Sequence, residues 1–256
     1  METDITPRTV SIVVATINPR PDIENLVASI SIQNPKPHQV VVVDSSPDGG
    51  LERMFERYKL SDILSYIEQE PSGIYSAWNL ALQKVTGNLV WFLGDDDELS
   101  PGTMHIITEK VSKTEMSSQN TFLIPVKRST DIVRFNPKSA WQWRFGTPKS
   151  FEHSGFICSM GLFKEYGGFC EDYRIAGDYE WLLRIFLSSG ILRTVCLINE
   201  CPPLIKGGEG ISSYDKKTIF REVRQARRHH QIPAHTMFDF LIDLREWLLT
   251  LYRRLG

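Results

Sequence analysis

Three adjacent carboxylates follow an apolar segment of strand type near the end of the first hundred residues. Residues 90–93 are Val-Trp-Phe-Leu, and after one glycine come Asp95, Asp96 and Asp97. Neighbouring like charges raise one another's pKa unless a cation lies among them. At the carboxyl end of a strand in an α/β sheet, where ligands commonly bind, such a cluster indicates a divalent cation with a phosphate-bearing ligand. The alternative is a solvated acidic turn before a helix that starts near Ser100.

Four apolar segments of strand type alternate with helical patterns in this part of the chain. They are residues 10–16, 39–44, 63–67 and 89–93. The segments are apolar throughout rather than at every second position, which is typical of a mostly parallel sheet with helices on both faces. Two of the strands, the one ending at Asp44 and the one before the acidic cluster, bring carboxylates to the same edge. The pattern therefore predicts an α/β domain with a binding site at that edge.

Further helices and strands are expected around this core. Asp22 is a candidate cap for a helix that ends near Gln33, and Asp178 begins another helical pattern as a cap or a first-turn residue. The remaining expected segments are extended at 121–128, 131–135, 153–158 and 191–198, and helical at 160–166.

The character of the sequence changes toward the end of the chain. Lysine and arginine dominate residues 216–228, and leucines recur at spacings of three and four over residues 237–255. We expect one domain over residues 1–211 and C-terminal helices over residues 212–256. The apolar stripe could pack on the domain, pair with a second copy of the chain or lie in a membrane interface. An ordinary solvated face is the alternative for the basic residues.

The overall composition narrows the classes of function. The 256 residues carry a formal net charge of −2, which gives no electrostatic case for nucleic-acid binding. No apolar stretch approaches the roughly 20 residues of a membrane span, and the first apolar run is too short for a secretory signal. We therefore expect a cytoplasmic protein with reduced cysteines. A zinc site of Cys196, Cys201 and a histidine is the alternative, although this spacing matches no usual pattern.

Six segments resemble, in order, the motifs of family 2 glycosyltransferases of the GT-A fold. They are VSIVVATIN at 10–18, VVVDSSPDG at 41–49, EPSGIYSAWN at 70–79, FLGDDDEL at 92–99, GF and GDY within 168–184, and GGEGIS at 207–212. The resemblance implies a Rossmann-like, mostly parallel central sheet flanked by helices, with a C-terminal helical extension. It also implies an inverting transferase of bacterial polysaccharide synthesis, such as that of lipopolysaccharide or capsule.

The resemblance assigns a role to each matched polar position. The implied donor-binding residues are Thr16, Asn18, Asp44, Gly73, Asp95 and Asp96. Asp97 together with Asp95 would hold Mn²⁺ or Mg²⁺ against the diphosphate of a nucleotide sugar, with a lean toward UDP-sugars. Asp178 would be the base that removes the proton of the acceptor hydroxyl in a single inverting displacement. The alternative for Asp178 is a plain helix N-cap.

Two further residues are candidates for the acceptor side. His153 could line the acceptor pocket or be a satisfied buried histidine, and Trp143 could stack on a sugar ring or simply pack. The resemblance implies a saccharide acceptor, often one linked to a lipid diphosphate on the inner face of the cytoplasmic membrane. Peripheral attachment to anionic lipid through the C-terminal helices is then expected. Whether the protein forms oligomers is left open.

Three positions depart from the family pattern. Ser45, Gly94 and Gly177 stand where the family often has acids. These departures keep open a binding module on the same fold that recognises a nucleotide sugar or a saccharide without turning it over. A receiver-like or phosphatase-like protein would also place acids at strand ends, but it would need a nucleophilic aspartate or an opposing lysine for which no clear motif is present.

Overall fold

A seven-stranded sheet forms the centre of the molecule. The computed structural model describes residues 8–18, 21–47, 50–114, 120–134, 152–189, 195–208 and 215–232. The strands of the central sheet are β1 (Val10–Thr16), β2 (Gln39–Asp44), β3 (Leu64–Glu68), β4 (Leu89–Leu93), β5 (Thr121–Leu123), β8 (Phe156–Ser159) and β9 (Val195–Leu197). A three-stranded sheet contains β6 (Val126–Arg128), β7 (Asp131–Val133) and β10 (Leu204–Lys206).

The strand order of the central sheet is β3-β2-β1-β4-β8-β5-β9. The first four strands pair in parallel, as their uninterrupted apolar pattern predicts. β8 is antiparallel to both of its neighbours, and β9 is parallel to β5. The sheet is therefore mixed, with the parallel part built by the N-terminal hundred residues. β1 and β4 are adjacent, so the acidic cluster after β4 lies at the same edge as the end of β1.

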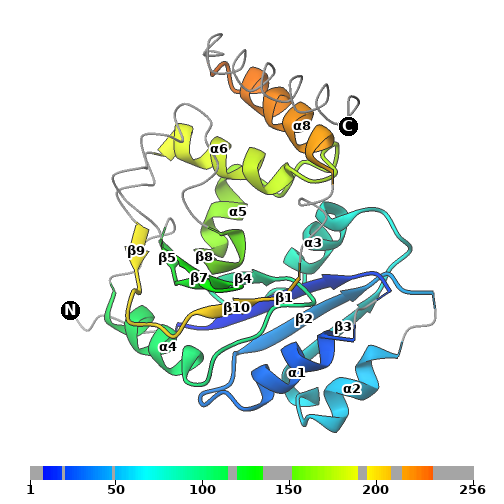
Figure 1. The fold of residues 1–256 in the computed structure, drawn as a ribbon, viewed down its shortest axis with the longest axis vertical. Helices are drawn as coiled ribbons and strands as arrows, with labels where there is room; N and C mark the ends of the chain where they lie inside the picture. Colours follow the sequence, from blue (N-terminus) through cyan, green and yellow to red (C-terminus); the bar gives the residue numbers. More distant parts are fainter. Residues whose placement is uncertain are drawn as a thin grey trace, which may run out of the picture.

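Helices cover both faces of the sheet (Figure 1). The helices are α1 (Ile23–Ser31), α2 (Leu51–Arg57), α3 (Ile74–Leu82), α4 (Thr103–Lys113), α5 (Met160–Tyr166), α6 (Gly177–Ser189) and α8 (Lys216–His229). Buried side chains of α1, α2 and α4 form one core with the sheet, and those of α3, α5, α6 and α8 form a second core on the other face. Figure 1 shows α8 beside α6, outermost in this second layer.

Alternate residues of each central strand enter different cores, because successive side chains of a strand point to opposite faces. Ile12 and Trp91 belong to the core under α1, whereas Val13 and Phe92 belong to the core under α3. All four side chains are buried. This two-sided burial explains why β4 is apolar throughout and β1 is apolar over residues 12–15; the hydroxyl of buried Ser11 donates to the Gln39 side chain.

Two helix starts bear on the sequence predictions. Asp22 occupies the N-cap position of α1, as predicted, but its side chain makes no capping hydrogen bond. α6 begins at Gly177, so Asp178 is a first-turn residue.

In the described part of the chain, no helix is long and apolar enough to cross a membrane. The leucine-rich pattern at 237–255 lies outside the described residues.

Candidate functional site

The ends of β1, β2 and β4 bring predicted donor-binding residues together. Strand register pairs Thr16 with Asp44 and Val14 with Leu93. Two residues past the end of β4, the Asp95 carboxylate therefore reaches the end of β1, where the Thr16 hydroxyl donates a 2.7 Å hydrogen bond to it. Parallel pairing alone thus places three of the predicted residues at one edge of the sheet.

Asp44 is buried and held by two donors. The backbone N–H of Ser46 donates to one carboxylate oxygen over 2.9 Å, and the hydroxyl of Tyr66 donates to the other over 2.5 Å. Asn18, in the left-handed region with φ of 50°, donates its backbone N–H to the Ser46 hydroxyl over 3.0 Å. The loops after β1 and β2 are therefore tied together next to a carboxylate, an arrangement that can orient a polar ring or a ribose.

Asp97 turns away from solvent. Only 2% of it is exposed, and its Oδ2 accepts a 2.7 Å hydrogen bond from the backbone N–H of Gly94. Its Oδ1 is buried without a hydrogen-bond partner among the described residues. Burial raises the pKa of Asp97 to about 7, although the Gly94 N–H and the Lys206 charge act in the opposite direction. Asp95 and Asp96 are each partly exposed.

Backbone pairing of β10 with Glu98 brings a lysine next to this acidic segment. The backbones of Glu98 and Ile205 exchange two hydrogen bonds of 2.8 and 2.9 Å. The next residue, Lys206, donates to Glu152 over 3.2 Å. A Cβ on Gly207 would lie 2.1 Å from the backbone oxygen of Asp96, so this close approach requires glycine. The sequence gives no motif for Lys206, because its place beside the carboxylates depends on pairing between segments a hundred residues apart.

The donor set of the acidic segment suits a hard divalent cation. Carboxylates are the preferred protein ligands of Mg²⁺ and Mn²⁺, and the buried, unpartnered Oδ1 of Asp97 is a group that a nearby cation would stabilise. Among the described residues, no group of three or more histidine, cysteine or acidic side chains forms a metal-binding cluster. A cation here would therefore need further ligands from a bound diphosphate or from water. The described residues also give no support to a zinc site at Cys196 and Cys201.

Asp178 lies on a separate helix and is partly exposed. Its Oδ1 accepts a 2.8 Å hydrogen bond from the backbone N–H of Tyr179 and lies 3.2 Å from the hydroxyl of Tyr75. The same hydroxyl is 2.6 Å from the backbone oxygen of Ile175, which it donates to. A Cβ on Gly177 would lie 2.7 to 2.9 Å from carbons of the Tyr75 ring. The glycine at this position is therefore explained by the ring that occupies the space of a side chain.

His153 begins the short helical turn that precedes β8 and is partly exposed. Its ring stacks on Trp78 with centroids 5.1 Å apart. Burial lowers the pKa of His153, and the Lys206 charge acts in the same direction, while the Asp178 charge raises it. The Lys206 charge thus lowers the pKa of both Asp97 and His153. Trp143, the other acceptor candidate, lies outside the described residues.

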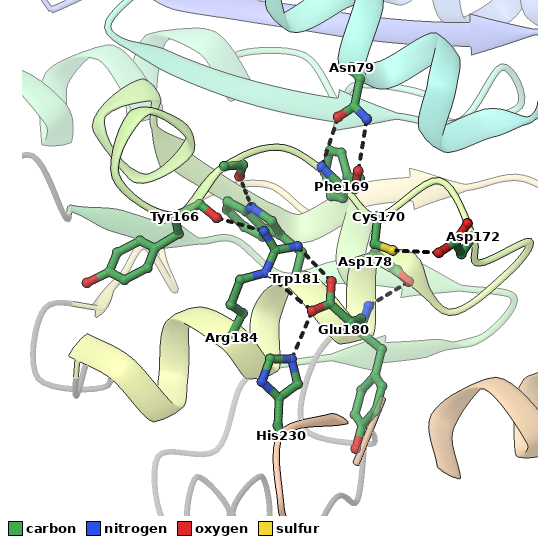
Figure 2. A network of polar contacts seen from close by, with 12 residues as sticks. Asn79, Tyr166, Phe169, Cys170, Asp172, Asp178, Glu180, Trp181, Arg184 and His230 are labelled. Carbon is green, nitrogen blue, oxygen red and sulfur yellow. Dashed lines mark hydrogen bonds and ion pairs between the residues drawn. The ribbon is translucent and has the colours of Figure 1, made fainter. Parts of the chain in front are cut away.

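A polar network behind Asp178 holds α6 in place (Figure 2). Glu180 is 3% exposed and pairs with Arg184 over 2.7 Å and with His230 over 2.8 Å. The side chain of Asn79 donates to the backbone oxygen of Phe169 over 2.9 Å and accepts from its N–H over 2.8 Å. The segment that carries Asp178 is thus fixed to α3 on one side and to the end of α8 on the other.

Gly73 stands apart from these contacts. It directly precedes α3 with a φ of 98°, and no atom would lie within 4 Å of a Cβ there. Tyr66, Lys206, Glu152 and Tyr75 were not among the predicted site residues. Tyr75 is buried, but its hydroxyl faces Asp178. Buried aromatic residues at helical spacing carry no signal for such a contact.

A family model and several solved structures match the chain. The model of the family described as glycosyl transferase family 2 matches residues 11–163, which is more than half of the chain. No curated protein sequence matches the chain. Among solved structures, S. aureus TarS is 21% identical with a TM-score of 0.61, over 84% of this chain and 39% of that one.

Two similar structures contain donor molecules. Residues 1–349 of S. aureus TarS in complex with UDP-GlcNAc are 20% identical with a TM-score of 0.62, over 80% of this chain and 61% of that one. The mannosyltransferase PcManGT from Pyrobaculum calidifontis, in complex with GDP-Man and Mn²⁺, is 22% identical with a TM-score of 0.56, over 82% and 62% of the two chains. The chain spans less than two thirds of the length of each. At these identities the likeness confirms the fold, the Rossmann-like GT-A architecture that the motifs imply.

Proposed function

The chain belongs to glycosyl transferase family 2, and from this premise we propose that it transfers a sugar from a nucleotide-sugar donor to a hydroxyl group of a saccharide acceptor. The observation that carries the proposal is the convergence at one sheet edge of Thr16, Asp44 and Asp95. Asp178 supplies a further, partly exposed carboxylate on α6. Carboxylates for a diphosphate–cation complex and a separate carboxylate for proton removal are the two requirements of such a transfer.

Donor binding is assigned to the ends of β1, β2 and β4. Asp44, fixed by Ser46 and Tyr66, would accept hydrogen bonds from the nucleoside, and Thr16 would hold Asp95 in place beside it. UDP is the proposed nucleotide, which the motif resemblance favours. The presence of UDP-GlcNAc in one similar structure and GDP-Man in another supports a nucleotide sugar as the class of donor.

A divalent cation, Mn²⁺ or Mg²⁺, is proposed to bind at the acidic segment. Asp95 and Asp97 would hold the cation, Asp97 through its unpartnered Oδ1 while its Oδ2 stays on the Gly94 N–H. The partly exposed Asp96 would contribute to donor binding. The bound cation would supply Lewis-acid stabilisation of the leaving diphosphate. Lys206, held by Glu152, adds a fixed positive charge at the same segment.

Asp178 is the proposed base. Its partly exposed carboxylate is oriented by the Tyr179 N–H, which donates to Oδ1. The Tyr75 hydroxyl lies 3.2 Å from the same oxygen, so that the other oxygen can accept a proton. A single in-line attack by the acceptor hydroxyl on the anomeric carbon breaks the bond to the diphosphate and inverts that carbon. His153, stacked on Trp78, is the proposed acceptor contact, with Trp143 as a second candidate.

The acceptor is proposed to be a saccharide carried on a lipid diphosphate, in bacterial surface polysaccharide synthesis on the cytoplasmic side of the membrane. The basic helix α8 supports this proposal, because Lys216, Lys217, Arg221 and Arg228 are exposed on it. Exposed cations on one helix attract anionic lipid surfaces.

A thermal-shift measurement tests donor binding directly. The full chain is heated with UDP-GlcNAc or GDP-mannose, each with and without Mn²⁺, and with each free nucleotide as the control. Ligand at about 100 times its Kd should stabilise the folded state by about 2.7 kcal/mol. We expect a metal-dependent shift with one donor. A shift without release of nucleoside diphosphate in the presence of any saccharide acceptor would indicate the binding-module alternative, and no shift with any donor would contradict the proposal.

A further inference from the structure

Helix α8 carries a single acid among six lysine and arginine residues. That acid, Glu222, is 3% exposed although its neighbours along the helix include exposed Arg221 and Gln225. A carboxylate is rarely buried without partners, because removing its charge from water is costly. Glu222 must therefore be compensated by groups from another segment.

The compensation comes from three consecutive backbone amides. The N–H of Arg174 donates to Oε1 over 3.0 Å, and those of Ile175 and Ala176 donate to Oε2 over 2.8 and 2.9 Å. Hydrogen bonds to an ionised acceptor are about twice as strong as neutral ones. The three donors immediately precede Gly177, where α6 begins. Glu222 thus fixes the backbone that leads into the first turn of α6.

Ile175 links the Glu222 contact to the surroundings of the candidate base Asp178. The carbonyl of Ile175 accepts the Tyr75 hydroxyl over 2.6 Å, and that hydroxyl lies 3.2 Å from Asp178. Both backbone polar groups of Ile175 are therefore hydrogen-bonded, the N–H to Glu222 and the C=O to the Tyr75 hydroxyl. A shift of this residue would move the Tyr75 hydroxyl and Asp178 together.

We propose that Glu222 is a positioning residue for the transfer reaction, which sets the orientation of Asp178 through the 174–176 backbone and the Tyr75 hydroxyl. The inference rests on the proposed function of Asp178 and extends it to a helix outside the family match at residues 11–163. A second contact, between His230 at the end of α8 and Glu180, joins the same two helices (Figure 2). If Glu222 merely anchored α8, its loss would lower stability without changing turnover by the folded protein.

Glu222→Gln is the test variant, because it keeps the size of the side chain and removes the charge and one acceptor oxygen. Gln225→Ala, an exposed change on the same helix, is the matched control. Glu222→Asp retains the charge on a shorter stem and serves as the milder variant should Glu222→Gln not fold. Release of UDP from UDP-GlcNAc or of GDP from GDP-mannose is measured at 15 °C with Mn²⁺, with water or an added saccharide as acceptor. Amide hydrogen exchange over residues 174–176 is measured on the same samples without donor.

We expect Glu222→Gln to lower kcat on the order of tenfold or more, because small misplacements of a catalytic group are costly. The donor KM should stay within about twofold of the wild-type value, since the donor residues lie on other strands. Amide exchange at 174–176 should be faster in Glu222→Gln than in the wild type. Glu222→Asp should have a kcat and an exchange rate between those of Glu222→Gln and the wild type, and Gln225→Ala should match the wild type in both. An unchanged kcat in folded Glu222→Gln, or unchanged exchange at 174–176, would overturn the inference. If the wild type releases no nucleoside diphosphate from any donor, the proposed function fails instead, and the exchange result alone decides whether Glu222 fixes this backbone.

Discussion

Asp178 is held in place by the Tyr179 N–H and faces the Tyr75 hydroxyl, so its orientation is set before any acceptor binds. Asparagine has nearly the same shape but cannot accept a proton from a hydroxyl. We predict that Asp178→Asn lowers turnover by roughly 10²–10⁴-fold, the usual contribution of a general base. Donor binding should be retained, because the donor residues lie at the strand ends. The measurement is nucleoside diphosphate release together with donor-induced thermal shift, and turnover at the wild-type rate would remove Asp178 as the base.

His153 gives a pH-dependent prediction. Burial lowers its pKa below the ordinary value of about 6.5, so the folded state binds fewer protons at this ring than the unfolded chain does. The free energy of unfolding should therefore fall as the pH drops below about 6.5. His153→Asn lacks this contribution. We expect the difference in unfolding free energy between wild type and variant to shrink when urea denaturation at pH 7.5 is repeated at pH 5.5, whereas a constant or growing difference would contradict the assignment.

At the scale of elements, two side chains of α3 join it to the segment before α6, Tyr75 through Ile175 and Asn79 through Phe169. Asn79 both donates to and accepts from the backbone of Phe169, which is 5% exposed. Asn79→Leu would leave these two backbone groups without partners, at a cost of about 1–3 kcal/mol for each buried group. We expect a lower urea midpoint with an unchanged m-value, and Gln83→Ala, an exposed change just after α3, should have little effect. A midpoint equal to that of the wild type would show that this joint does not contribute to stability.

The strands of the parallel part could be predicted from the sequence because runs of apolar residues within each strand mark them. β1, β2 and β4 each contain four or more consecutive apolar residues, and their observed bounds match the predicted ones at residues 10–16, 39–44 and 89–93. β8 was expected only as an extended segment, and its antiparallel place between β4 and β5 could not be predicted, since strand direction depends on tertiary pairing. Two short strands replaced the single expected one at 121–128 for the same reason: β5 joins the central sheet and β6 the smaller one.

The candidate site shows the same division between local and long-range information. The sequence alone brought out Asp44, Asp95 and Asp178, because each stands at the end or beginning of a periodic segment. Tyr75 and Glu222 carried no such signal: one looks like a core aromatic residue, and the other stands in a helix whose charges suggest a solvated face. Their part in the site depends on contacts spanning about a hundred and nearly fifty residues of sequence, respectively.

Over the whole molecule, the exposed cations of α8 give a surface that can be tested for lipid binding. Each lysine or arginine near an anionic membrane surface contributes about 1 kcal/mol, and the attraction weakens with salt. We predict that the protein sediments with vesicles containing about 30% anionic phospholipid. The bound fraction should fall in about 0.5 M NaCl. It should also fall when the charges of Lys217, Arg221 and Arg228 are reversed. Vesicles of phosphatidylcholine alone are the control. Equal binding to both kinds of vesicle, or none to either, would speak against this surface as the attachment site.

The contact between Glu222 and residues 174–176 also has a consequence for synthesis on the ribosome. The amides are made 46 residues before the carboxylate that engages them. At the usual rate of about 5–20 residues per second, translation takes roughly 2–9 s to cover that distance. A nascent chain in this interval already contains Thr16, Asp95 and Asp178, yet the backbone next to the candidate base has no anionic partner. The order of translation thus places completion of the site after the synthesis of α8 rather than after that of the sheet.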